Sequence, residues 1–180
     1  MIRLTGGERR GLTLHAPRGA QTRPATARIR QWIFDVLGPP TGRTVLDLFA
    51  GTGAVGLEAL SRGAAAALFV ENAAPALQAL HRNLEKTRYV DRGEVWPLPV
   101  PAAADRLVRA GRSFDLVFCD PPYAWDALEE LLAESVLDLV APGGTLVVEH
   151  RGDRPLAPRG RMPDRERDFG ETRLSLWTAP

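Results

Sequence analysis

Short apolar runs alternate along the chain with longer segments whose apolar residues recur at helical spacing. Runs of strand length lie at residues 44–49, 64–70, 94–98, 114–119 and 145–149. Helical spacing follows the Gly53 turn to about Gly63 and then covers residues 73–86, 102–110 and 125–140. Buried parallel strands read as near-continuous apolar runs, and helices cross over between them. The pattern therefore predicts an α/β fold with an open, mostly parallel sheet.

Both ends of the chain carry short strands separated by glycine turns, at Gly6-Gly7 and at Gly170. Each pair of strands predicts a β-hairpin. The paired strands are residues 2–4 with 12–15, and residues 165–168 with 172–178. A capped helix is expected over residues 27–37. We therefore divide the chain into a small extension of hairpin and helix, residues 1–40, and a main domain, residues 41–180.

The strand at residues 114–119 ends abruptly in Asp120-Pro121-Pro122-Tyr123. Two consecutive prolines fix φ and donate no N–H, so the strand cannot continue and the turn is rigid. Open α/β sheets bind ligands at the carboxyl ends of their strands, where this turn is expected to lie. The Asp120 carboxylate and the Pro121 carbonyl can accept the two hydrogens of an exocyclic amine, while Tyr123 stacks on the base. A plain strand-to-helix turn with a capping aspartate is the alternative interpretation.

A glycine-rich turn follows the first strand of the main domain. Gly51, Gly53 and Gly56 have the G-x-G-x-x-G spacing between a strand and a helix, and glycines allow a ligand to approach the backbone closely. Asp47 precedes them, where a carboxylate disfavours a phosphate but tolerates a cationic amine. Glu71 lies about 20 residues further on, where an acid can accept both ribose hydroxyls, although it can also cap a helix. The combination favours S-adenosylmethionine over NAD.

Composition is that of an ordinary globular protein, with 44% hydrophobic and 25% charged residues. The net charge of +1 gives no overall sign of a nucleic-acid partner. Lys86 is the only lysine, and the arginine bias suits phosphate recognition but equally a GC-rich genome or a thermophilic source. The single cysteine, Cys119, excludes an internal disulfide and is expected in the core. Neither a membrane-spanning run nor an apolar signal segment is present, so we expect a cytoplasmic enzyme.

Arginines are concentrated in the front segment of the chain. They are Arg3, Arg9, Arg10, Arg18, Arg23, Arg28 and Arg30. Such a cluster can grip an RNA backbone through its phosphates, or it can form an ordinary solvated surface. The residues by themselves favour neither interpretation.

Together the motifs resemble the S-adenosylmethionine-dependent methyltransferases of the class I Rossmann-like fold. Asp47 to Gly53, Glu71 and Asp120 to Tyr123 match the cofactor, ribose and amine-binding motifs of that family in the usual order. Within the family the chain is similar to the small bacterial RsmD type, which methylates N2 of one guanine in 16S ribosomal RNA. This narrower match rests on the overall length, the C-terminal hairpin and a set of front residues: Gly6-Gly7, Arg10-Gly11, Arg23-Pro24, Arg28, Arg30 and Phe34.

The resemblance implies a seven-stranded, mostly parallel sheet with an antiparallel C-terminal hairpin strand. It implies a catalytic corner formed by Asp120, Pro121, Pro122 and Tyr123. The cofactor-binding residues that it implies are Asp47, Phe49, Ala50, Gly51, Thr52, Gly53, Glu71, Asn72, Leu98 and Asp120. The RNA-binding residues that it implies are Arg3, Arg10, Arg23, Arg28 and Arg30. S-adenosylmethionine would be the methyl donor, without a metal. The partner would be 16S ribosomal RNA or an assembling small ribosomal subunit, and we expect a monomer.

The chain departs from the family pattern at a few positions. Ala25 and Ala27 stand where the front helix often has Thr and Asp, and Asp35 stands where Asn is usual. The acid that often follows the third strand to hold the adenine amine is absent before Asp105. Backbone groups near Leu98 are expected to take that role.

Two other functions remain open. Adenine N6 in DNA and a glutamine amide in a protein also present a planar NH2, so Asp120-Pro121-Pro122-Tyr123 does not distinguish them from guanine N2. The small size argues against a DNA enzyme that reads sequence, because no additional recognition domain is present. A catalytically inactive RNA-binding assembly factor is the alternative from another functional class, and the intact motif argues against it.

Overall fold

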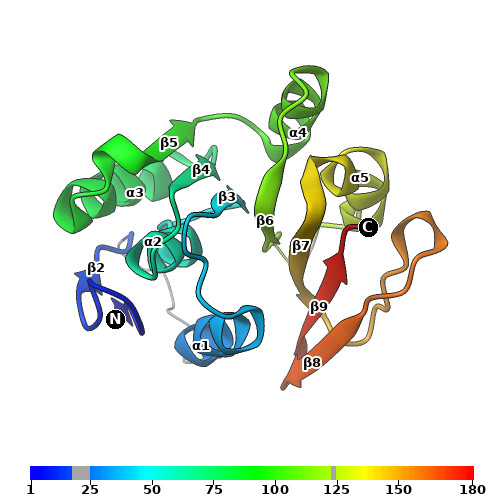
Figure 1. The fold of residues 1–180 in the computed structure, drawn as a ribbon, viewed down its shortest axis with the longest axis horizontal. Coiled ribbons are helices and arrows are strands. Elements are labelled where there is room, and N and C mark those ends of the chain that lie inside the picture. The colour runs from blue at the N-terminus through cyan, green and yellow to red at the C-terminus, as the bar shows by residue number, and fades with distance from the viewer. Residues whose placement is uncertain (18–24, 123–124) are drawn as a thin grey trace.

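The structure is a computed structural model, and it describes residues 1–17, 25–122 and 125–180. Within these ranges the central element is a seven-stranded sheet with the order β5-β4-β3-β6-β7-β9-β8 (Figure 1). Its strands are β3 (Thr44–Leu48), β4 (Ala66–Val70), β5 (Gly93–Trp96), β6 (Phe114–Cys119), β7 (Val140–Arg151), β8 (Arg165–Phe169) and β9 (Thr172–Thr178). The predicted apolar runs therefore form the strands, with shifted boundaries.

Most strand pairs of the sheet are parallel. β3 pairs in parallel with β4 and with β6, and the parallel arrangement extends outward to β5 and β7. β9 runs antiparallel to its neighbours β7 and β8. The chain changes direction across the sheet between β3 and β6, which is where open α/β sheets bind ligands. The expected Rossmann-like fold with an antiparallel C-terminal hairpin strand is confirmed.

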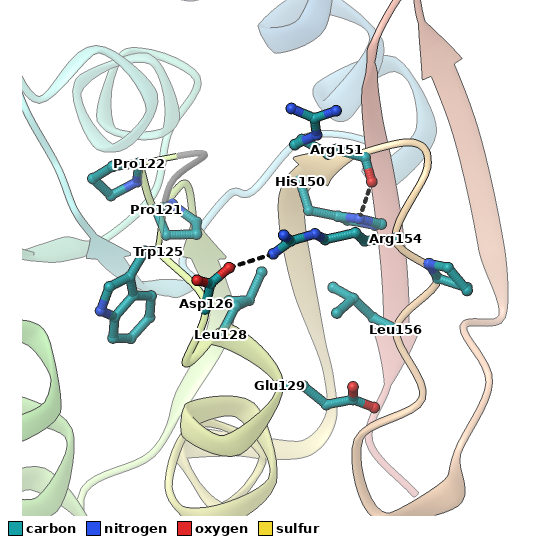
Figure 2. Close-up of a pocket in the computed structure, with 11 residues that line it drawn as sticks. Pro121, Pro122, Trp125, Asp126, Leu128, Glu129, His150, Arg151, Arg154 and Leu156 are labelled. Atoms are coloured by element: carbon teal, nitrogen blue, oxygen red, sulfur yellow. Dashed lines mark hydrogen bonds and ion pairs between the residues drawn. The ribbon is translucent and has the colours of Figure 1, made fainter.

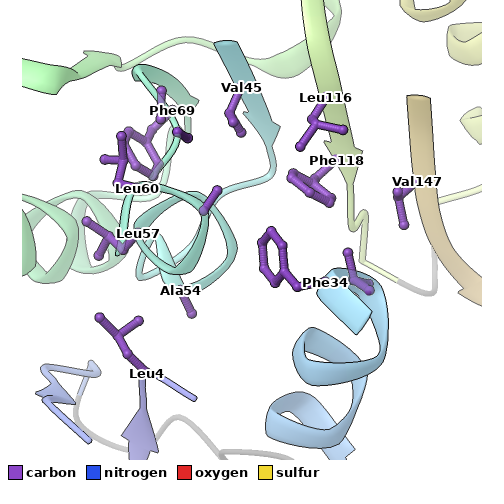
Figure 3. Packing of buried hydrophobic residues seen from close by; sticks show 14 of the residues in the cluster. Leu4, Phe34, Val45, Ala54, Leu57, Leu60, Phe69, Leu116, Phe118 and Val147 are labelled. Carbon is purple, nitrogen blue, oxygen red and sulfur yellow. The ribbon is translucent and has the colours of Figure 1, made fainter. Parts of the chain in front are cut away.

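Helices cover both faces of the sheet, because alternate strand residues point to opposite sides. Leu116 and Phe118 of β6 pack with one group of helices, and Val117 and Cys119 pack with another. The first group is α1 (Ala25–Leu37), α2 (Ala54–Ser61) and α3 (Ala74–Thr87), and the second is α4 (Val100–Arg109) and α5 (Leu128–Glu134). Figure 3 shows the first core, where Phe34 of α1 lies against Phe118 with ring centroids 6.1 Å apart. Among the described residues, none of the helices combines the length and apolar character that a bilayer crossing requires.

The N-terminal hairpin of β1 (Ile2–Arg3) and β2 (Thr13–Leu14) forms a separate two-stranded sheet. Leu4 nevertheless belongs to the same core as α2, which Figure 3 shows. The Glu58 carboxylate of α2 accepts hydrogen bonds from the Thr5 backbone N–H at 2.9 Å and from the Thr5 hydroxyl at 2.6 Å. At the turn, a Cβ on Gly7 would lie 1.8 Å from the Ser61 carbonyl oxygen, so only glycine fits this close approach. The hairpin is therefore seated on α2.

The segment after the proline corner differs from its prediction. A continuous helix over residues 125–140 was expected, but α5 covers Leu128–Glu134 and a 3-10 turn, η2 (Val136–Leu139), follows. Ser135 leaves the helical conformation, and its hydroxyl donates to the Asp105 carboxylate at 2.9 Å. The helix thus ends at a residue whose side chain contacts a different helix. Residues 141–144 lie within β7, whose pairing with β6 shifts register between Phe114 and Leu116.

Candidate active site

The glycine-rich turn between β3 and α2 forms one part of the site. Three residues of this turn have left-handed backbone conformations: Phe49 with φ 58°, Gly51 with φ 55° and Gly53 with φ 77°. A Cβ on Gly53 would also lie 2.4 Å from Leu80 Cδ1, so this position has no room for a side chain. A hydrogen bond to the neighbouring strand also holds the turn, because the Ala50 N–H donates to the carbonyl of Val70 at the end of β4 at 3.0 Å. The predicted turn thus presents its backbone at the carboxyl end of β3.

Asp47 is a buried carboxylate directly before this turn, with 4% of its surface exposed. Its Oδ2 accepts a hydrogen bond from the Gly56 N–H at 2.9 Å. Burial raises the pKa of Asp47 to about 8, and the nearby charges of Asp120 and Glu71 add to the effect, while the Gly56 N–H opposes it. A cationic group beside Asp47 would remove this penalty, because an opposite charge favours the ionised carboxylate.

Glu71 joins the glycine turn to the start of α3. Its Oε2 accepts from the Gly51 N–H at 2.8 Å, and its Oε1 accepts from the Asn72 and Ala73 N–H groups at 2.8 Å each. Both N–H groups precede Ala74, the first residue of α3, and no side chain caps that helix, so the alternative role of Glu71 as a helix cap is not observed. Because the same carboxylate also contacts the turn, it lies at the edge where a ribose is predicted to bind.

The remaining cofactor-binding residues expected from the sequence lie around the same edge. The Thr52 carbonyl accepts from Asn83 Nδ2 of α3 at 2.9 Å, which holds the turn against that helix. Leu98 follows β5 and is half-buried, and its N–H donates to the Trp96 carbonyl at 2.9 Å. The Glu71 N–H donates to the same carbonyl at 3.3 Å. The ends of β4 and β5 therefore lie together, although the adenine contact near Leu98 stays a prediction.

The proline corner lies beside the glycine turn, because β6 pairs with β3. The Asp120 N–H approaches the Leu48 carbonyl at 3.4 Å, and the residue is exposed. Pro121 is buried and Pro122 is exposed, and the Pro122 carbonyl accepts from the Trp125 N–H at 2.9 Å. Tyr123, predicted to stack on the acceptor base, lies outside the described residues. The corner thus holds the Asp120 carboxylate at the surface, next to the turn that follows β3.

Cys119 at the end of β6 is buried, with 1% of its surface exposed. Burial raises the pKa of its thiol far above the usual range, and the charges of Asp120 and Asp47 add to this. The thiol is therefore protonated at neutral pH, which agrees with the expected role as a core residue and not a nucleophile. Within the described ranges, no group of three or more His, Cys, Asp or Glu side chains could hold a metal ion.

A cavity of about 350 Å³ lies on the other side of the corner, over the carboxyl ends of β6 and β7. Pro121, Trp125 and Leu128 line one side of it, and His150, Arg154 and Leu156 line the other (Figure 2). Trp125 also packs edge-on against Phe49 of the glycine turn, with ring centroids 5.2 Å apart. The sequence alone gives no sign of this cavity, because the polar segment after residue 149 has no apolar pattern that would reveal its neighbours. His150 is buried, with its Nε2 2.8 Å from Ser175 Oγ.

The arginines predicted to bind RNA fall into different environments. Arg3, Arg10 and Arg28 are exposed, and Arg23 lies outside the described residues. The expectation that Arg30 contacts RNA is wrong for this structure, because only 1% of its surface is exposed. It pairs with the buried Glu58 at 3.4 Å and donates to the Arg3 carbonyl at 2.7 Å. Arg30 lies on the inward face of α1 and fastens that helix to α2 and to the hairpin.

The chain matches known proteins over almost its entire length. The family described as "Conserved hypothetical protein 95" matches residues 2–178. "Ribosomal RNA small subunit methyltransferase D" of Escherichia coli K12 is 38% identical over 132 residues, which are 73% of this chain and 65% of that protein. The solved structure of a hypothetical protein from Thermus thermophilus, TTHA0928, has a TM-score of 0.83 at 36% identity and covers 98% of each chain.

A more distant solved structure shares the fold. It is the Thermus thermophilus 16S rRNA N2 G1207 methyltransferase RsmC in complex with AdoMet and guanosine, with a TM-score of 0.72. Its identity is 20%, and the match covers 91% of this chain and 45% of that one. The family match over residues 2–178 agrees with the motifs at the glycine turn and the proline corner. The chain belongs to this family, "Conserved hypothetical protein 95", the family of RsmD-type methyltransferases.

Proposed function

We propose that this protein transfers a methyl group from S-adenosylmethionine to the exocyclic N2 of a guanine in 16S ribosomal RNA. The observation that carries the proposal is the shared edge of β3, β4 and β6. There the glycine turn with Asp47 and the proline corner with Asp120 lie side by side. Burial raises the pKa of Asp47, and the nearby charge of Asp120 adds to this effect. One edge can therefore hold a donor and an acceptor in contact.

The residues at the turn fit S-adenosylmethionine. Its amino-acid part carries an ammonium group, which suits the buried Asp47 carboxylate because the charge lowers the penalty for ionisation. Glu71, already beside the Gly51 N–H, is an acceptor suited to ribose hydroxyls. The backbone of Gly51 and Gly53 can approach the ligand without obstruction from a Cβ. When bound, S-adenosylmethionine supplies an electrophilic methyl group on a positively charged sulfur.

Asp120 and Pro121 would hold the acceptor. The exocyclic amine of guanine is a poor nucleophile, because its lone pair is delocalised into the ring. Acceptance of its two N–H bonds by the Asp120 carboxylate and the Pro121 carbonyl would aim the lone pair at the methyl group. The N–C bond would form as the C–S bond breaks, sulfur would keep the electron pair of the broken bond, and the amine would release a proton to water. Positive charge develops on nitrogen in this step, so the neighbouring Asp120 carboxylate stabilises the transition state.

The choice of RNA rests on the family and on the exposed arginines. The Escherichia coli relative is named as a small-subunit ribosomal RNA methyltransferase. Arg3, Arg10 and Arg28 lie on the surface, where their charge is available to an RNA backbone. The assignment to guanine N2 is the finer part of the proposal, since adenine N6 and a glutamine amide present the same planar NH2 to Asp120.

Transfer of labelled methyl groups tests the proposal. The purified protein is incubated with labelled S-adenosylmethionine and, separately, with unmodified small-subunit RNA, DNA and ribosomal proteins. We expect label in the RNA alone, mapped to guanine N2. Label in DNA or protein would identify another planar amine as the acceptor. Label in none of them would indicate an inactive RNA-binding factor.

The role of Asp120 has its own test. Asp120→Ala should reduce turnover by more than about 100-fold, as removal of a transition-state stabiliser typically does. Its affinity for S-adenosylmethionine, measured by calorimetry, should remain largely intact. Asp91→Ala is the control, because Asp91 is exposed in η1 (Val90–Arg92), before the opposite end of β5. Near wild-type transfer by Asp120→Ala would contradict the mechanism.

A further inference from the structure

A salt bridge spans the cavity beside the proline corner. Arg154 Nη1 lies 2.6 Å from Asp126 Oδ1, and both residues line the cavity (Figure 2). Asp126 comes just before α5, whereas Arg154 lies in the loop after β7. The two side chains therefore bridge the cavity from its opposite sides, close to Pro121 of the corner.

This ion pair is easily exchanged for another partner. The side chains are 60% exposed for Arg154 and 81% exposed for Asp126. An exposed ion pair contributes little to stability, because water screens the charges and the side chains lose freedom. A guanidinium group matches a phosphate with two parallel N–H donors, and its bonds to a phosphate are charge-assisted. Phosphate can therefore compete with the Asp126 carboxylate for Arg154.

An acceptor nucleotide would bring such a phosphate to this place. A base that is methylated must leave its stack, so it enters the site together with its own sugar and phosphate. The cavity shares Pro121 and Pro122 with the corner proposed to hold the acceptor amine. Its volume of about 350 Å³ lies within the usual range for small-ligand sites. Arg154 thus lines the same cavity as the two prolines of the corner that is proposed to hold the base.

We propose that Arg154 binds an RNA phosphate next to the methylated nucleotide, and that Asp126 holds Arg154 in place until the RNA arrives. This inference rests on the proposed function and identifies a contact in the acceptor site. Arg154 is a substrate-binding residue, while Asp126 competes with the RNA. Removal of Asp126 should therefore strengthen RNA binding, which an ordinary surface ion pair would not do.

Binding to unmodified small-subunit RNA at several salt concentrations tests this proposal. Arg154→Ala should raise the Kd about tenfold and reduce the slope of log Kd against log salt by about one, as loss of one phosphate contact predicts. Arg154→Lys keeps the positive charge but lacks the two parallel N–H donors of a guanidinium group. The slope of log Kd against log salt should therefore stay unchanged, while part of the RNA affinity is lost. Asp126→Asn should lower the Kd several-fold. In turnover assays, Arg154→Ala should raise KM for RNA more than it lowers kcat.

Asp138→Asn is the matched control. Asp138 pairs with Arg159 at 2.7 Å, both side chains are 46% exposed, and neither residue lines this cavity. We expect unchanged RNA binding for this variant and unchanged affinity for S-adenosylmethionine in every variant. An unchanged salt slope in Arg154→Ala, or equal RNA affinity in Asp126→Asn and Asp138→Asn, would overturn the proposal. A wild-type protein that methylates no RNA would instead refute the proposed function.

Discussion

The protonation of Asp47 should control the affinity for S-adenosylmethionine. In the ligand-free protein, burial holds the pKa of Asp47 at about 8, so its carboxyl group is mostly protonated at neutral pH. The ammonium group of the ligand favours the ionised form and should lower that pKa on binding. Binding must then release a proton from Asp47 whenever the pH lies below about 8. Affinity is therefore expected to rise with pH.

The size of the effect follows from the pKa. If the pKa in the complex falls to about 5 or lower, the apparent Kd above pH 6 is inversely proportional to the ionised fraction of Asp47 in the free protein. With a free pKa of about 8, the Kd should fall about 20-fold between pH 6 and pH 7.5. Above about pH 8 the α-amino group of the ligand loses its own proton, so the increase in affinity should stop there.

Isothermal calorimetry in buffers of different ionisation enthalpy measures both the Kd and the number of protons released. Asp47→Asn serves as one control, because an amide does not titrate; its affinity should be weaker and independent of pH in this interval. 5′-Methylthioadenosine serves as the other, because it lacks the amino-acid part. Its affinity for the wild type should change little with pH. A pH-independent Kd for S-adenosylmethionine in the wild type would refute the assignment of Asp47 to the ammonium group.

Three further predictions concern stability and RNA contact. The raised pKa of Asp47 stabilises the ligand-free protein at pH values below the ordinary pKa of 3.8, and this contribution is lost as the pH rises toward about 8. The thermal midpoint should therefore fall between these two pH values. Asp47→Asn should make the thermal midpoint less dependent on pH. Gly53→Ala should destabilise the protein by about 2 kcal/mol or more in urea titrations, because a left-handed backbone and contact with Leu80 both oppose a Cβ. Arg30→Met should cost about 3 kcal/mol in the same assay without changing the salt dependence of RNA binding, because Glu58 would lose a buried partner. Arg28→Ala should leave the stability unchanged but reduce the salt dependence of RNA binding, because Arg28 is exposed. Equal stability and equal salt dependence of the two variants would contradict this distinction.

The sequence predicted the sheet well, because its strands are buried on both faces. Leu116 to Cys119 alternates between two cores, so every residue of that run is apolar and the pattern is unmistakable. The prediction of one long helix over residues 125–140 was wrong, because it depended on local apolar spacing alone. The apolar spacing continued past Ser135, but the contact of Ser135 with Asp105 depends on a helix that lies 30 residues earlier in the chain. Local spacing carries no information about such a partner.

The sequence indicates which motif residues share one edge of the sheet, while their roles in binding and catalysis stay predictions. Asp47, the glycine turn, Glu71 and Asp120 meet at one edge, since each lies at or just after the end of a parallel strand. Burial of Arg30 was not predictable, because helical position alone does not show that Glu58 receives it. The cavity beside the corner was missed for the same reason, as Arg154 and Asp126 come from segments 28 residues apart.

The docking of the N-terminal hairpin onto the main domain has a consequence for folding during synthesis on the ribosome. Glu8 accepts a hydrogen bond from the hydroxyl of Tyr89 at 2.8 Å, and the His15 N–H donates to Asn83 Oδ1 at 2.7 Å. The hairpin is therefore synthesised before these partners, which lie 81 and 68 residues later in the chain. Leu4 can be covered once α2 has been synthesised, but the contacts with Asn83 and Tyr89 are still missing at that point, and the nascent segment is then exposed to chaperones and proteases. The hairpin can complete its contacts only after Tyr89, which follows α3, has been synthesised.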